Sequence, residues 1–158
     1  MNLKPNDGES AAEFLARVES ARDARRAVVK AAHDMQRAID LAAIDEIEAE
    51  LGDSAVALLE LPFVEGMPCL LAVRCPSKME VKRYRETNKI KKGEVDAKLA
   101  VDSAEQLGRV CLVYPKKEAD GTCPAYDAIL EVRPSVASQI GLEALKLGQG
   151  RAVEDAKS

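Results

Sequence analysis

"SAAEFLARVESARDARRAVVKAAHDMQRAIDLAAIDEIEAEL", residues 10–51, contains neither Gly nor Pro and is rich in Ala, Arg and Glu. This composition favours helix, and the two residue types that interrupt helices are missing, so the stretch predicts one long helix. Ser10 and Glu13 have the spacing of a capping box, and Gly52 suits the left-handed residue after the last turn. At about 1.5 Å per residue the helix would reach roughly 60 Å, more than one small domain needs.

The apolar residues of this helix recur at steps of three and four, which places seven of them on one stripe: Phe14, Val18, Ala21, Val28, Ala32, Met35 and Ile39. Arg25 interrupts the stripe, and Ile44, Ile47 and Leu51 continue it on a shifted face. An unbroken heptad would favour a dimeric coiled coil, but the break and the many Ala residues weaken that prediction. Two interpretations stay open. The helix folds against its own domain, or it binds a second copy or another helix through a contact that includes Val28 and Met35.

A hairpin is predicted directly after this helix. Residues 55–75, "AVALLELPFVEGMPCLLAVRC", contain two apolar runs around Glu65 and Gly66. Pro62 and Pro68 cannot donate to a strand ladder, so they belong at strand ends or at an edge. An isolated hairpin is marginally stable, so the rest of the chain must cover this one.

Three further helices are expected. Ser77 and Glu80 form a second capping box at the start of a basic helix over residues 78–92, which Gly93 breaks. A helix follows within residues 93–115, with Val95, Leu99 and Leu107 as its buried positions. After Pro134 a last helix is expected to bury four residues and to stop at Gly148; the four are Val136, Ile140, Ala144 and Leu147.

The predicted fold is therefore α+β and mainly α-helical, with a long N-terminal helix, a small β-hairpin and a C-terminal helical bundle. We expect a flexible N-terminus over residues 1–9, the long helix over 10–52 and a compact α+β domain over 53–150. The long helix is a candidate arm for oligomerisation or for binding a partner. Residues 151–158 are expected to form a flexible tail.

The composition limits the function classes. The chain of 158 residues is 47% apolar, carries a formal charge of −4 and has no apolar run long enough to span a membrane. The first residues lack the apolar segment of a secretory signal, so we expect a cytoplasmic protein. The four cysteines form no C-x-x-C pair and His33 is the only histidine, so we expect reduced, buried thiols and no metal site.

Residues 78–92, "KMEVKRYRETNKIKK", hold seven basic and two acidic residues. On a helix, five of the basic residues share one narrow arc: Lys78, Lys82, Arg85, Lys89 and Lys92. A solvated helix face, a docking surface for an acidic protein and a nucleic-acid site would all fit such a stripe. The chain is acidic overall and only 3% aromatic, so nucleic-acid binding is unlikely and protein docking is preferred.

Catalytic patterns are missing from the sequence. It has no Gly-rich phosphate loop and no G-x-S-x-G element, and His33 lies inside the long helix. Four acids read as helix-surface residues by their spacing and not as a carboxylate pair across a cleft: Asp40, Asp45, Glu46 and Glu48. We therefore expect no enzyme, no catalytic residue and no cofactor.

Three segments carry a resemblance to a known family. They are "LPFVEGMPCLLAVRCPSKMEVKRYRETNK", "AEQLGRVCLVYP" and "YDAILEVRPSVASQIGLEALKLGQG". The first segment is a strand-rich opening before a charged helix, the second is a helix before a polar loop, and the third is an apolar turn before an Ala- and Leu-rich helix. This order of parts resembles the tail assembly chaperones of long-tailed bacteriophages over about residues 55–150. The long helix of residues 10–51 exceeds the family pattern.

The resemblance implies a non-enzymatic chaperone that forms oligomers, coats the aggregation-prone tape-measure protein and helps recruit tail-tube subunits. Exposed helix faces and the lack of a catalytic pattern suit that role. Two alternatives remain. One is a structural subunit retained in a phage particle or another assembly, and the other is a nucleic-acid-binding protein that uses the basic helix 78–92.

Overall fold

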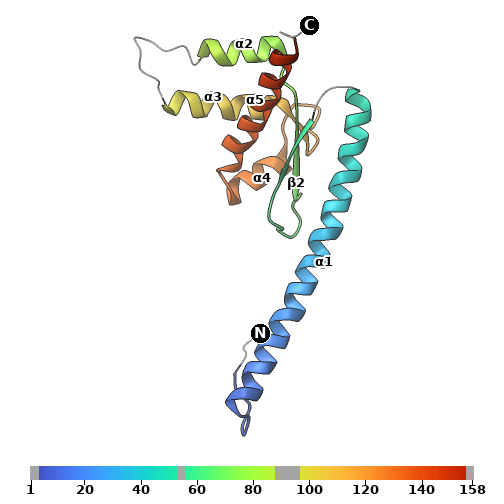
Figure 1. Cartoon of the computed structure of the whole chain (residues 1–158), viewed down its shortest axis with the longest axis vertical. Coiled ribbons are helices and arrows are strands. Elements are labelled where there is room, and N and C mark those ends of the chain that lie inside the picture. The colour runs from blue at the N-terminus through green and yellow to red at the C-terminus, as the bar shows by residue number, and fades with distance from the viewer. Residues whose placement is uncertain (1–3, 53–55, 88–96, 156–158) are drawn as a thin grey trace.

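The computed structural model describes residues 4–52, 56–87 and 97–155, with side chains as far as residue 149 (Figure 1). Its elements in chain order are α1 (Ala11–Leu51), β1 (Val56–Glu60), β2 (Leu70–Arg74), α2 (Lys78–Thr87), α3 (Ala97–Cys111), β3 (Leu112–Tyr114), α4 (Pro124–Val132) and α5 (Val136–Asp155). The predicted α+β, mainly helical fold is confirmed.

Helix α1 begins and ends as its sequence predicts. The Ser10 hydroxyl accepts a hydrogen bond from Glu13 N at 3.3 Å, and the Glu13 carboxylate accepts one from Ser10 N at 2.9 Å. Gly52 follows the last turn with φ of 64° and donates its N–H to Glu48 O at 3.0 Å. The capping box therefore satisfies open backbone donors at one end, and glycine provides the positive φ at the other.

The predicted hairpin is present and is part of a three-stranded antiparallel sheet in the order β1-β2-β3. Strand β3 was not predicted, because its three residues are too few to show an alternating pattern. It pairs with the otherwise open edge of β2. This makes β2 the central strand of the sheet.

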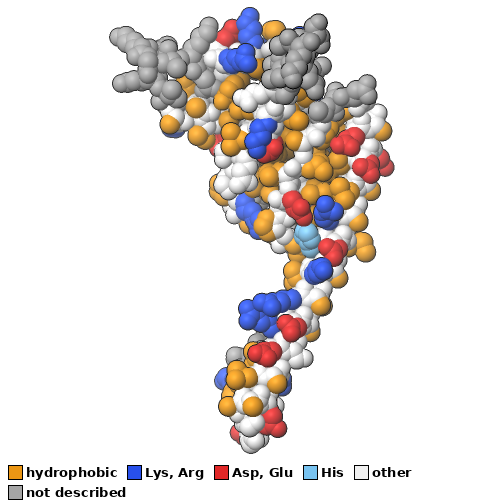
Figure 2. Space-filling model, viewed as in Figure 1, with side chains coloured by type: hydrophobic (Ala, Val, Ile, Leu, Met, Phe, Trp, Pro, Cys, Tyr) orange, Lys and Arg blue, Asp and Glu red, His pale blue; other side chains and the backbone are white. Residues whose placement is uncertain are grey.

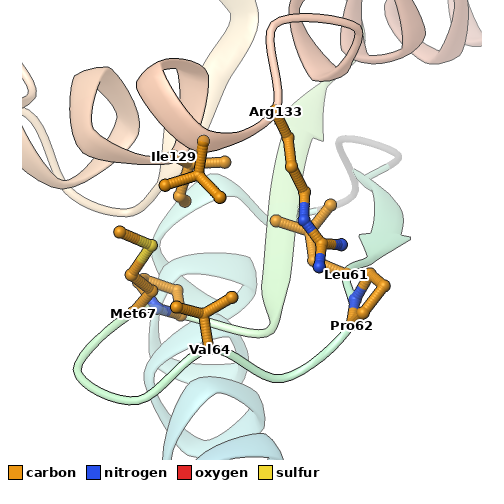
Figure 3. A pocket seen from close by; sticks show the side chains of 8 residues that line it. Leu61, Pro62, Val64, Met67, Ile129 and Arg133 are labelled. Atoms are coloured by element: carbon orange, nitrogen blue, oxygen red, sulfur yellow. The ribbon is translucent and has the colours of Figure 1, made fainter.

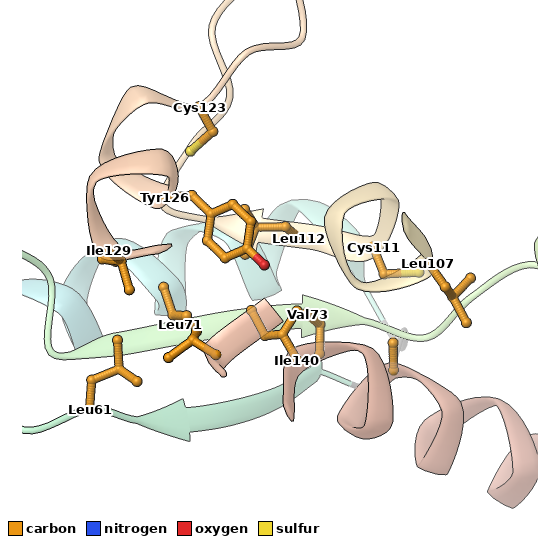
Figure 4. Packing of buried hydrophobic residues seen from close by; sticks show 12 residues of the cluster. Leu61, Leu71, Val73, Leu107, Cys111, Leu112, Cys123, Tyr126, Ile129 and Ile140 are labelled. Atoms are coloured by element: carbon orange, nitrogen blue, oxygen red, sulfur yellow. The ribbon is translucent and has the colours of Figure 1, made fainter. Parts of the chain in front are cut away.

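Each face of β2 is covered by helices. Leu70 and Ala72 point toward α1, where they pack with Ile44. Leu71 and Val73 belong to the larger cluster on the other face, formed with α3, α4 and α5. Figure 4 shows this cluster around Tyr126, Leu112 and Ile140. Because adjacent strand residues point to opposite faces, a continuous apolar run such as "LLAV" suits a strand that is buried on both sides.

Two glycines bring α3 and α5 into close contact. A Cβ built on Gly108 would lie 2.5 Å from Ile140 Cγ2 and 2.7 Å from Gly141 N. A Cβ on Gly141 would overlap the backbone oxygen of Ala104. The crossing therefore depends on the missing side chains at both positions.

Three expectations about the later helices need correction or qualification. Leu107 is buried as predicted, but Leu99 is 40% exposed, and Val95 lies outside the described residues. Gly148 does not end α5, which continues to Asp155 and so includes the first residues of the expected tail. A Cβ on Gly148 would lie 2.9 Å from the Pro76 ring, so this glycine allows a close contact instead of marking a stop.

Candidate functional site

The base of α1 is fixed to the sheet by the buried carboxylate of Asp40. Its Oδ2 accepts hydrogen bonds from the N–H groups of Cys69 at 2.7 Å and Leu70 at 3.0 Å, where β2 begins. Its Oδ1 accepts bonds from the Tyr114 hydroxyl at 2.6 Å and from Gln36 Nε2 at 2.8 Å. Burial opposes ionisation, but these hydrogen bonds outweigh it and hold the pKa of Asp40 below its ordinary value.

The prediction that Asp40 is a helix-surface acid is wrong. The other acids of that group, Asp45, Glu46 and Glu48, are exposed as expected. Asp40 lies one turn before Ile44 and two turns before Ile47, and these two residues are the buried apolar positions of α1. Its place on that face indicated burial, but three of its four donors come from distant residues, Cys69, Leu70 and Tyr114, which the sequence did not show to be near it.

The first half of α1 extends beyond the domain as an arm (Figure 1), which we define as residues 11–32. No residue of the arm is buried. Val28 on the arm is 69% exposed, Met35 just beyond it is 65% exposed, and Ile39 is 55% exposed. The structure thus places both predicted contact residues, Val28 and Met35, on the surface, and the half of α1 that carries Val28 does not fold against its own domain.

The start of the arm is held by a local contact with the segment before it. Arg17 donates hydrogen bonds from Nε and Nη2 to the Glu9 carboxylate at 2.9 and 2.8 Å, and from Nη2 to Lys4 O at 2.9 Å. Its guanidinium also lies 5.4 Å from the centre of the Phe14 ring. Residues 4–9, expected to be part of a flexible N-terminus, are thereby tied to the first turns of α1.

A groove of about 450 Å³ lies where the arm leaves the domain. We call it the basic groove; its lining residues are Arg25, Arg26, Val29, Lys30, His33, Pro62 and Phe63. His33 meets Phe63 edge-on, with 6.3 Å between ring centroids, and its Nε2 lies 3.8 Å from Glu60 Oε1. Figure 2 shows Lys and Arg side chains gathered on this part of the arm. The groove combines an apolar floor with positive charge, which suits an acidic, partly apolar segment of another protein.

The basic face predicted on residues 78–92 is partly described. Lys78, Lys82 and Arg85 are exposed on α2, with Lys82 Nζ at 3.8 Å from Glu86 Oε1. Lys89 and Lys92 lie outside the described residues. Val81 and Tyr84 are half-buried, as expected for the opposite side of the helix. In Figure 1 α2 lies at the end of the domain away from the arm, so the structure does not bring the two predicted contact regions together.

Helix α2 is anchored by an ion pair at its first turn. Arg74 donates from Nη1 and Nη2 to the two oxygens of Glu80, at 3.0 and 2.8 Å. Glu80 also accepts a bond from Ser77 N at 2.7 Å, which completes the second predicted capping box. These bonds, with that from Arg74 the strongest, lower the pKa of Glu80 to about 2.

A second hollow lies between the hairpin loop and α4. Leu61, Val64, Met67 and Ile129 form its apolar walls, and Arg133 closes one side (Figure 3). Its volume of about 10 Å³ is at the lower limit for one water molecule. This hollow is a packing gap and is too small to be a ligand site.

The cysteines are placed as predicted. Cys69, Cys75, Cys111 and Cys123 are all buried and form no disulfide. Burial raises the pKa of the Cys69 and Cys111 thiols to about 11. Within residues 4–52, 56–87 and 97–155, no three His, Cys, Asp or Glu side chains come together as metal ligands. None of the helices in these ranges is both long and apolar enough to cross a membrane.

Comparisons with protein-family models, with curated proteins and with solved structures find no match for this chain. The candidate site is therefore defined by its geometry: an exposed arm, a basic groove at its base and a basic face on α2.

Proposed function

We propose that the chain is a non-enzymatic assembly protein that holds another protein by means of α1. The observation that supports this most is the arm itself. Helices gain most of their stability in proteins by packing an apolar face, yet the arm carries apolar side chains along its length and buries none of them in its own domain. A second protein chain would provide that missing cover.

The charged surfaces indicate the kind of client. The basic groove and the basic face of α2 both favour acidic segments, and the apolar floor at Val29, Pro62 and Phe63 would hold an apolar side chain of the client. Within this class, the resemblance of residues 55–150 supports a tail assembly chaperone whose clients are a tape-measure protein and tail-tube subunits. We place this chaperone in the bacterial cytoplasm, where tails are assembled.

The test is co-expression with the tape-measure and tail-tube proteins encoded by the same genome. We expect the chain to keep the tape-measure protein soluble in a complex, and to be absent from finished particles. A variant that carries Arg26→Glu and Lys30→Glu in the basic groove should lose the complex while remaining folded. Lys146→Glu, an exposed charge reversal on α5, is the matched control and should keep it.

Two results would contradict this function. A tape-measure protein that stays insoluble with and without the chain would remove the chaperone role. Finding the chain in purified particles at a fixed copy number would instead assign it as a structural subunit.

A further inference from the structure

A heptad pattern runs along the face of α1 that points away from the domain. Its positions alternate in steps of three and four from residue 21 to residue 49, and we call them the outer seam: Ala21, Ala24, Val28, Ala31, Met35, Ala38, Ala42, Asp45 and Ala49. From Ala24 onward every member is exposed, whereas Asp40, Ile44 and Ile47 on the opposite face are buried. The stripe expected from the sequence ran through Ala32 and Ile39 and was broken by Arg25. The outer seam passes beside Arg25 without a break.

Four continuous heptads, charged only at Asp45, remove the break that weakened the coiled-coil prediction for the first stripe, although Ala fills most of the positions. Six of the nine seam residues are Ala, whose small side chains let two helices approach closely, and Val28 and Met35 add larger contacts near the middle. The seam stops at Arg17, the next position in the pattern, because that side chain is occupied by Glu9 and the Lys4 backbone.

The charge along α1 decides which chain can cover this seam. Residues 22–37 contain five basic residues and two acids, whereas residues 40–51 contain five acids and no basic residue. Figure 2 shows Asp and Glu side chains near the domain end of α1, and a group of Lys and Arg side chains on the arm with some acidic side chains beside them. A parallel pair of identical helices would place like charges side by side, and an antiparallel pair places opposite charges together.

We propose that two copies of the chain form an antiparallel coiled coil through the outer seam of α1. The proposal goes beyond the proposed function, because the partner is a second copy and none of the nine seam positions lines the basic groove; Arg25, which flanks the seam, also borders the groove. In the register that best matches the charges, Ala24 lies opposite Ala49, Ala31 opposite Ala42, and Met35 opposite Ala38. Asp45, the charged seam position, falls opposite Val28 near each end.

This register brings Arg25 of each copy beside Glu46 of the other, so the contact occurs twice. Both side chains are exposed in the single chain and flank the seam. Arg25 is also long enough to reach Asp45 of the second copy. Because each domain packs on the side of α1 opposite to the seam, the two domains point away from one another and leave the contact open.

Sedimentation equilibrium of the full chain tests the proposal with a charge exchange. We expect a dimer for the natural sequence, and dissociation constants raised by about tenfold or more in Arg25→Glu and in Glu46→Arg, since each variant creates two repulsive contacts. The double variant should restore the dimer. Arg22→Glu, on the same helix but turned away from the seam, is the control and should leave the dimer unchanged.

The remaining outcomes overturn the proposal. They are a monomer for the natural sequence, a dimer that neither single variant weakens, or a double variant no better than the single ones. Circular dichroism should show native helix content in every variant, because the changed side chains are exposed. The co-expression test changes Arg26 and Lys30, which are not seam positions, and the dimer test includes Glu46→Arg, which lies outside the basic groove, so the two proposals can fail separately.

Discussion

The Tyr114 hydroxyl donates a 2.6 Å hydrogen bond to Asp40 Oδ1, which joins the last strand of the sheet to the middle of α1. The same carboxylate accepts hydrogen bonds from the N–H groups of Cys69, just before β2, and Leu70, its first residue. One buried side chain thus connects three elements in the half of α1 that packs on the domain. This anchor sets the direction in which the arm projects.

Replacing Tyr114 by Phe should lower the free energy of unfolding by about 1–3 kcal/mol, because hydrogen bonds to charged groups contribute about this much. Asp40→Asn should lower the free energy of unfolding further, because all four partners of the carboxylate are donors and an amide NH₂ cannot accept hydrogen bonds from them. Urea denaturation measures both. Tyr126→Phe is the control: that buried hydroxyl has no hydrogen-bond partner in the described part of the chain, so stability should be equal or higher. Equal losses at both tyrosines would contradict the anchor.

Gly141→Ala should lower the thermal stability strongly. The new Cβ would overlap the Ala104 backbone oxygen, and only a separation of α3 and α5 could relieve this. Overpacking of this kind costs about 1–3 kcal/mol or more. Leu142→Ala, at the exposed next position of α5, should have a small effect in the same melting experiment. A Gly141→Ala variant as stable as the natural chain would show that the two helices do not cross this closely.

Acid should destabilise the domain partly through Glu80. Its pKa is about 2 in the folded chain, below its ordinary value of 4.5, so ionised Glu80 stabilises the fold above about pH 4.5. That contribution is lost as the pH falls from about 4.5 to 2 and amounts to about 3 kcal/mol. Glu80→Gln should therefore reduce the free energy of unfolding at pH 7 and make its decrease below pH 4.5 smaller. Glu86→Gln, the same change at an exposed position of α2, is the control and should change stability at pH 7 little.

Local signals account for the parts of the fold that were predicted. These signals lie within continuous segments of the sequence. They are the capping boxes at Ser10 and Ser77, the long stretch without Gly or Pro, and the two apolar runs of the hairpin. They gave α1, the start of α2 and the β1–β2 pair.

The features that were missed depend on contacts between distant segments. Asp40 can be buried because the N–H groups of Cys69 and Leu70 and the Tyr114 hydroxyl donate to it, and Gly148 lies inside α5 where Pro76 packs against it. The basic groove combines α1 with Pro62 and Phe63 of the hairpin loop. The outer seam is the exception: it is present in the sequence, but only the burial of Ile44 and Ile47 on the opposite face shows which stripe of α1 is left uncovered.

The central claim is that α1 binds a second copy of the chain antiparallel through the outer seam, and distances between spin labels test it most directly. Single cysteines at Ser20 and Asp34, both exposed beside the seam, can be labelled while the four native thiols stay buried. At about 1.5 Å per residue, the antiparallel register places the two Ser20 labels roughly 50 Å apart along the axis and the two Asp34 labels within roughly 10 Å of the same level. We expect one long and one short distance by pulsed electron paramagnetic resonance. Two short distances would show a parallel pair, and the absence of dipolar coupling at both sites would show a monomer; either result would contradict the account.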